Sequence, residues 1–184
     1  MENKINIRQI TIIGVITAVI CILGPLSIPI GVVPISFTNL AIYFALYTLG
    51  MRKGTLSYIV YMLIGLVGIP VFSGFSGGMT KLVGPTGGYI IGFIFMALIG
   101  GWVIDRFWDK WYLALLGLVA GTAVCYLFGS VWLAYQAHMS LGAAFSAGVI
   151  PFIPGDMVKM LIAVLAGPQI RRGLIKANLI WAKH

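Results

Sequence analysis

Six runs of apolar residues divide the chain, and charged residues, prolines or glycine-rich stretches bound them. The runs cover approximately residues 8–24, 37–49, 55–69, 89–104, 112–135 and 154–170. Only 9% of the residues are charged, whereas soluble domains carry about a quarter. A soluble fold needs polar side chains on its surface, so the pattern predicts an all-α membrane protein with six transmembrane helices. We expect a single transmembrane domain over residues 1–184.

Two segments rich in Gly and Pro interrupt this pattern, at residues 25–36 and 71–88. The second, third and sixth runs beside them are shorter than the roughly 20 residues of a complete membrane crossing. Irregular backbone in a membrane must be buried in protein or line a water-filled space. We therefore expect both segments to form re-entrant loops that line a cavity on the outer side.

Basic residues are concentrated on one predicted face of the membrane. Ten of the twelve lie near the N-terminus, in the links after the second and fourth runs, or at the C-terminus. The positive-inside rule makes this face cytoplasmic. We therefore expect a multi-pass protein of the bacterial cell membrane, with both ends of the chain inside the cell. The net charge of +8 is distributed in short clusters between apolar runs, which argues against nucleic-acid binding.

Four polar side chains are predicted to share one level in the outer half of the membrane. At a rise of 1.5 Å per helical residue, Asp156 lies about 22 Å and Lys159 about 18 Å above the inner boundary. The same count puts Asn39 at about 20 Å and Tyr89 at about 24 Å. Asp156 and Lys159 are also neighbours on one helix face. Intramembrane charges usually mark function, so we interpret this layer as a solute pocket, with a purely structural ion pair as the alternative.

Further residues are candidates for the walls and mouth of this pocket. Aromatic side chains at Phe37, Tyr43, Phe72 and Phe75 supply apolar surface. Lys81 in the outer loop either meets a carboxylate of the solute or is an ordinary solvated lysine.

The sequence offers no signal for catalysis or for a metal. It has no G-x-x-x-x-G-K-[ST], H-E-x-x-H or G-x-S-x-G motif. Cys21 and Cys125 lie in apolar runs without metal-binding spacing, and both histidines are isolated. We expect no enzymatic activity, no metal and no cofactor. A pair of small residues, Gly14 and Ala18, allows close approach of another helix, either a partner's or one of this chain's own. For Gly117-x-x-x-Gly121 internal packing is the favoured interpretation.

Two longer stretches resemble a known family. They are GLVGIPVFSGFSGGMTKLVGPTGGYIIGF at residues 65–93 and IPFIPGDMVKMLIA at residues 150–163. Both are similar to the BioY family, the biotin-binding S components of energy-coupling factor (ECF) transporters. The resemblance implies an S-component-like bundle that captures biotin from outside with high affinity. It also implies a membrane coupling (T) component and two cytoplasmic ATPases as partners.

Matched positions carry the family's functional residues onto this chain. They are Gly84, Thr86, Gly88 and Tyr89 in the first stretch, Asp156 and Lys159 in the second, and Gly14 and Ala18 for docking of the coupling component. We predict that Asp156 accepts a hydrogen bond from a ureido N–H of biotin, and that Lys159 donates to a ligand oxygen or holds Asp156. Tyr89 and Asn39 complete the polar contacts in this prediction.

Other functions are also compatible with the sequence. One is an S component for another vitamin, such as thiamin or riboflavin. A second is a stand-alone facilitator of a small solute, and a third is a membrane enzyme or assembly factor, against which the missing catalytic motifs argue.

Overall fold

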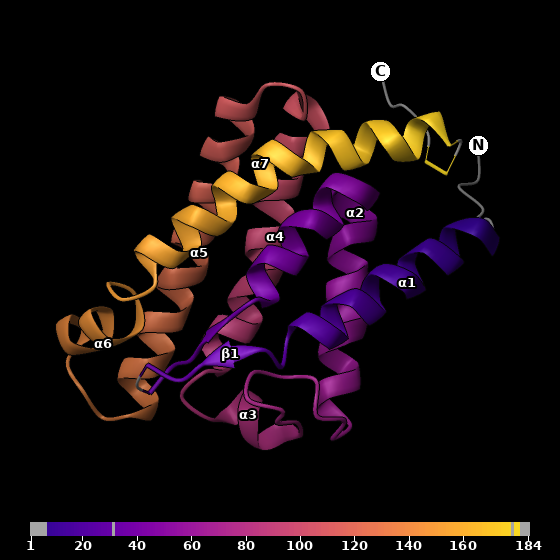
Figure 1. Ribbon diagram of the computed structural model, residues 1–184. Coiled ribbons are helices and arrows are strands. Elements are labelled where there is room, and N and C mark those ends of the chain that lie inside the picture. The colour runs from indigo at the N-terminus through magenta and orange to yellow at the C-terminus, as the bar shows by residue number, and fades with distance from the viewer. Residues whose placement is uncertain (1–6, 31, 178, 181–184) are drawn as a thin grey trace.

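A helical bundle with one short β-hairpin forms the architecture of the chain (Figure 1). The computed structural model describes residues 7–30, 32–177 and 179–180. The elements in chain order are α1 (Ile7–Leu23), β1 (Ser27–Ile28), β2 (Ile35–Ser36), α2 (Thr38–Leu66), α3 (Met79–Val83), α4 (Gly87–Phe107), α5 (Trp111–Gln136), α6 (Leu141–Gly148) and α7 (Ile153–Lys176). Each of the six predicted apolar runs is helical over most of its length, and the two strands pair in antiparallel fashion. The prediction of a mostly helical membrane protein is confirmed.

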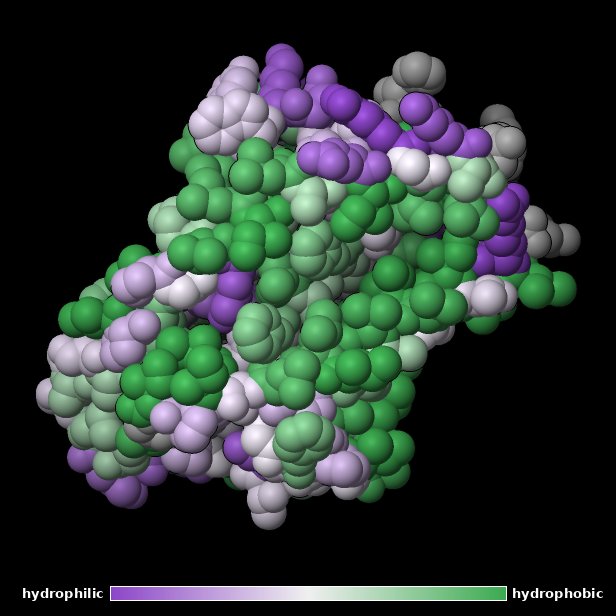
Figure 2. All heavy atoms as spheres, viewed as in Figure 1, coloured by the Kyte–Doolittle hydropathy of each residue, from purple (hydrophilic) through white to green (hydrophobic). Residues whose placement is uncertain are grey.

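Helices of membrane-spanning length and composition make up much of the described chain. α4, α5 and α7 are each long and apolar enough to cross a membrane, and α1 is a shorter apolar helix. The outer faces of these helices carry large apolar side chains, including Ile22, Leu127 and Leu165. Figure 2 shows the result as a broad hydrophobic band across the middle of the molecule, with hydrophilic residues gathered along its upper edge. Lipid is the solvent that suits such a band.

A sharp bend at Gly50 joins the second and third predicted helices into α2. Gly50 has a φ of 76°, a conformation that disfavours side chains, and a Cβ there would lie 2.6 Å from Oδ1 of Asp105. The other oxygen of Asp105 accepts a hydrogen bond from the backbone N–H of Met51 at 3.0 Å. Just beyond the bend, Gly54 packs against the backbone of Ala45, so the two parts of α2 lie against each other. The bend explains why each of the two apolar runs is short.

Helix α7 continues beyond the predicted boundary at Arg171. The sequence placed the end of the sixth run before this residue, yet α7 extends to Lys176 and Arg171 is buried. Its guanidinium lies 3.8 Å from Asp105 and stacks over the ring of Trp108 at 5.4 Å. The carboxylate and the aromatic face let an arginine remain in the bundle, which a count of apolar residues does not detect.

Close packing of α4 on α5 depends on glycines. A Cβ at Gly121 would lie 2.8 Å from the carbonyl oxygen of Met96, and one at Gly117 would meet the side chain of Val103 at 2.5 Å. The small-residue pair Gly117 and Gly121 therefore serves internal packing, as the sequence favoured.

The two predicted loop segments lie together at one end of the bundle, opposite the end where α1 begins and α7 finishes (Figure 1). The first contains the hairpin β1–β2, and the second contains α3. Gly74 of the second segment donates a hydrogen bond to the carbonyl of Pro25 in the first at 3.0 Å. α6, which the sequence did not predict, lies near this end in the link between α5 and α7.

Candidate functional site

A cavity opens between the helices at the end of the bundle that carries both loop segments. Its lining comes from these segments, from α2, α4, α5 and α7, and from the end of α6. The lining residues are Val33, Pro34, Ser36, Thr38, Asn39, Tyr58, Tyr61, Phe72, Ser73, Thr86, Tyr89, Ile90, Phe93, Thr122, Cys125, Tyr126, Gly148, Phe152, Asp156 and Lys159. Seven of these residues are aromatic and only two carry a charge, a composition typical of small-molecule sites.

The two charged residues form a buried ion pair in the first two turns of α7. Asp156 is 6% exposed and Lys159 is 7% exposed, and Nζ of Lys159 lies 3.0 Å from Oδ1 of Asp156. Their spacing of three residues puts them on one helix face. Pro154 in the first turn starts the helix without a lost hydrogen bond, and the positive end of the helix dipole favours a carboxylate there. Because both residues line the cavity, the pair is not sealed in dry packing.

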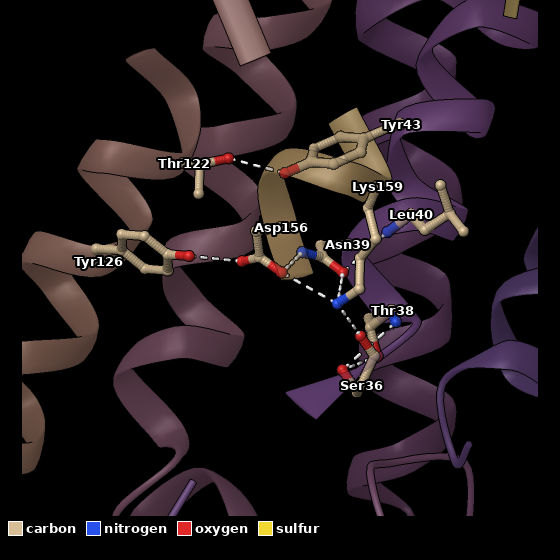
Figure 3. Close-up of polar contacts among 9 residues, drawn as sticks. All are labelled: Ser36, Thr38, Asn39, Leu40, Tyr43, Thr122, Tyr126, Asp156 and Lys159. Carbon is tan, nitrogen blue, oxygen red and sulfur yellow. Dashed lines mark hydrogen bonds and ion pairs between the residues drawn. The ribbon is translucent and has the colours of Figure 1, made fainter. Parts of the chain in front are cut away.

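Asn39 in the first turn of α2 connects both members of the pair (Figure 3). Its Nδ2 donates to Oδ1 of Asp156 at 2.7 Å, while its Oδ1 accepts from Nζ of Lys159 at 3.1 Å. The backbone N–H of Leu40 also donates to this Oδ1, at 3.0 Å. The carboxylate and the ammonium thus fix the orientation of the amide. The structure thus brings Asn39, Asp156 and Lys159 into direct contact.

Lys159 uses all three of its donors within the protein. Besides Asp156 and Asn39, its ammonium donates to the carbonyl oxygen of Ser36 in β2 at 2.7 Å. The ring of Phe37 lies 5.8 Å from the same nitrogen. An ammonium has three donors and no acceptor. In this arrangement Lys159 holds Asp156, Asn39 and the hairpin in place, which is one of the two roles that the sequence left open.

Tyr126 of α5 is the member of the cluster that the sequence analysis missed. Its hydroxyl donates to Oδ2 of Asp156 at 2.6 Å (Figure 3). Counting 1.5 Å per residue up from Lys110 puts Tyr126 at about 24 Å, the level predicted for the other polar groups. The position of Tyr126 along α5 is therefore the sequence signal that points to it.

Three more predicted residues lie at the cavity, namely Tyr89, Thr86 and Phe72. The hydroxyl of Tyr89 donates to the carbonyl of Gly148 at 2.8 Å, so this ring also connects α4 to the end of α6. Additional aromatic walls come from Tyr58, Tyr61, Phe93 and Phe152. The first two are held by hydrogen bonds to backbone carbonyls, of Ile90 at 2.7 Å and Val71 at 2.9 Å.

Other predicted residues lie outside the cavity lining. Tyr43 is buried behind it, where its hydroxyl and that of Thr122 share a hydrogen bond of 2.8 Å. Lys81 is in α3, and neither Phe37 nor Phe75 is a lining residue. Phe75 is 66% exposed.

Glycines of the first motif pack the end of the loop and the start of α4 against α5. The carbonyl of Gly84 accepts a hydrogen bond from the indole N–H of Trp132 at 2.9 Å. A Cβ at Gly88 would lie 2.3 Å from Cβ of Trp132, and Gln136 donates to the carbonyl of Val83. Among the matched positions of this motif, Thr86 and Tyr89 reach the cavity, whereas Gly84 and Gly88 shape the backbone around it.

The predicted docking residues lie on the outer surface of α1. Gly14 and Ala18 are both exposed, and no atom lies within 4 Å of a Cβ placed at Gly14. The buried face of α1 carries Ile13, Thr17 and Ile20 instead. Gly14 and Ala18 therefore take no part in packing α1 against the rest of the described chain.

These features define a multi-pass membrane protein with a buried polar cluster in a largely aromatic cavity. Residues 1–176 match the model of the BioY family, and the chain belongs to this family. The biotin transporter BioY of Thermotoga maritima is 37% identical over 166 residues, which cover 90% of this chain and 96% of the relative. The biotin transporter BioY2 of Lactococcus lactis is 30% identical over 97% of each chain.

A solved structure has the same fold. The crystal structure of the S-component for biotin from an ECF-type ABC transporter superposes with a TM-score of 0.84 at 31% identity, covering 94% of this chain and 95% of the other. These findings confirm the resemblance seen in the two motifs and the assignment to the cell membrane. Membership in a family of transporters also confirms that the chain is not an enzyme.

Proposed function

We propose that the chain captures biotin on the outer side of the cell membrane as the substrate-binding subunit of an ECF-type importer. The observation that carries this proposal is the cavity beside Asp156, whose carboxylate is buried, charged and held from three sides. Relatives named biotin transporters, and a solved S-component for biotin with the same fold, support the same ligand.

The contacts within the cluster leave room for a ureido ring. Oδ1 of Asp156 accepts from Asn39 and Lys159, and Oδ2 accepts from Tyr126. A carboxylate has about four acceptor positions, so one position on Oδ2 remains for an N–H of the ring. The amide nitrogen of Asn39 has a second hydrogen for the ring's carbonyl oxygen. Aromatic walls from Tyr58, Phe72 and neighbouring rings suit the apolar remainder of biotin.

Topology and partners complete the proposal. α1, the two parts of α2, α4, α5 and α7 are the six membrane segments, with both ends of the chain in the cytoplasm and the cavity facing outward. The basic clusters at the ends and in two links support this orientation. Gly14 and Ala18 meet the membrane coupling component, whose two ATPases supply the energy. Their exposure on α1 supports this assignment.

Calorimetry with the purified protein in detergent tests the ligand. Biotin should bind with at least a hundredfold higher affinity than thiamin or riboflavin, because neither matches both the ureido contacts and the apolar walls. Preferential binding of thiamin or riboflavin would refute biotin as the ligand and would make the chain an S component for that vitamin. Biotin flux into liposomes that contain only this chain would refute the subunit role, since a facilitator needs no partner.

A further inference from the structure

The hydroxyl of Tyr126 determines how many acceptor positions of Asp156 remain free for a ligand. The 2.6 Å contact joins a phenol and a carboxylate, and an ionised carboxylate only accepts, so the phenol must donate. Charge-assisted contacts of this length are strong. The carboxylate is therefore held at both ends, by Asn39 and Lys159 at Oδ1 and by Tyr126 at Oδ2.

This arrangement distinguishes between two kinds of donor. A neutral urea presents single N–H groups, and one of them fits the remaining acceptor position on Oδ2. A guanidinium presents two parallel N–H groups that seek both carboxylate oxygens at once. Here Oδ1 already accepts from two donors and Oδ2 from one, so the second N–H of such a fork finds no acceptor. An unpaired buried donor is costly, which disfavours the fork.

We propose that Tyr126 is a positioning residue that sets the specificity of the site for a neutral cyclic urea over a cyclic guanidine. The inference rests on the proposed function, since it assumes that the ligand's ring meets Asp156. Tyr126 lines the cavity from α5, which contacts the helix that carries Asp156, so its hydrogen bond also keeps the carboxylate facing the cavity. Oδ1 stays filled when the hydroxyl is removed, but Oδ2 then has two free positions, so this one oxygen can accept both N–H groups of a guanidinium. The carboxylate also loses the contact that holds it from α5.

The test compares two ligands in three proteins. The ligands are biotin and its analogue in which an imino group replaces the ureido oxygen, a cyclic guanidine that is cationic at neutral pH. The proteins are the parent, Tyr126→Phe and the control Tyr135→Phe, which alters a tyrosine of the same helix that is 75% exposed. Affinities are measured by calorimetry in detergent at neutral pH.

In Tyr126→Phe we expect biotin affinity to fall about tenfold, while the guanidine analogue binds as well as or better than it does to the parent. The ratio of the affinity for biotin to the affinity for the guanidine analogue should therefore fall at least tenfold. Tyr135→Phe should leave this ratio unchanged. Equal losses for both ligands, or an unchanged preference, would overturn the inference. Tyr126→Met, which also lacks the hydroxyl, must give the same narrowing if the phenylalanine variant proves unstable. If the parent itself does not bind biotin, the proposed function fails, whereas an unchanged preference in a biotin-binding parent refutes only the role of Tyr126.

Discussion

Neutralising Asp156 and Lys159 together separates an ion pair that only holds helices from one that also holds a solute. Lys159→Met leaves the buried Asp156, which is 6% exposed in the parent, without a cation, although Asn39 and Tyr126 still donate to its carboxylate. Removing one partner of a buried pair costs about 3–5 kcal/mol, and the two remaining donors put this variant near the lower end. Asp156→Asn likewise leaves the ammonium of Lys159 without its carboxylate partner.

The double variant Asp156→Asn/Lys159→Met removes both charges, so it should be more stable than the sum of the single losses implies. We expect a coupling of about 2–3 kcal/mol, measured by detergent-induced unfolding of the purified proteins. Although the double variant should regain part of the stability lost in the single variants, its affinity for biotin should remain low. Loss of a charged hydrogen bond costs about 1.5–3 kcal/mol, which corresponds to a loss of affinity of about 10- to 150-fold.

The exposed pair Asp109 and Lys110 in the link between α4 and α5 provides a matched control, and Asp109→Asn/Lys110→Met should change neither stability nor binding. The reasoning is wrong if the double variant at Asp156 and Lys159 is stable and binds biotin within threefold of the parent. That result would reduce the pair to a structural contact.

Two further predictions concern other parts of the chain. Gly14→Leu/Ala18→Leu should abolish biotin uptake in cells that express the coupling component and ATPases, yet leave binding to the purified chain intact; normal uptake would place the docking face elsewhere. Gly50→Ala should lower stability by about 1–3 kcal/mol in detergent unfolding, because alanine at a φ of 76° is strained and meets Asp105. Gly173→Ala, with open space around its Cβ, is the control, and equal effects would refute the argument from strain.

The sequence predicted the long apolar helices, but not the short α3 and α6, because apolar runs depend on local composition. It also brought Asn39 to the charged pair, because height along a helix follows from residue count alone. The bend at Gly50 and the burial of Arg171 were not predictable in this way. Both depend on Asp105, which comes from another helix and lies 55 and 66 residues away in the chain.

Residues in the loops were harder to assign than residues in the helices. Motif matching marked Gly84, Gly88 and Thr86 together, but a motif does not say which way each position faces. The structure places Thr86 at the cavity and uses the two glycines for contact with Trp132. Tyr126 escaped notice for a different reason, since a tyrosine in an apolar run carries no charge and so does not stand out as costly in a membrane.

Three helices begin at the cavity, and their dipoles favour a negative charge there. Asn39, Tyr89 and Asp156 lie in the first turns of α2, α4 and α7 respectively. The N-terminus of each helix carries the positive end of its dipole, so three partial positive charges surround the cavity. Asp156 and Lys159 cancel each other's formal charge, which leaves the helix ends to dominate the potential. We therefore expect the site to favour an anionic solute, and biotin, with one carboxylate on a neutral ring system, matches this expectation better than cationic thiamin does.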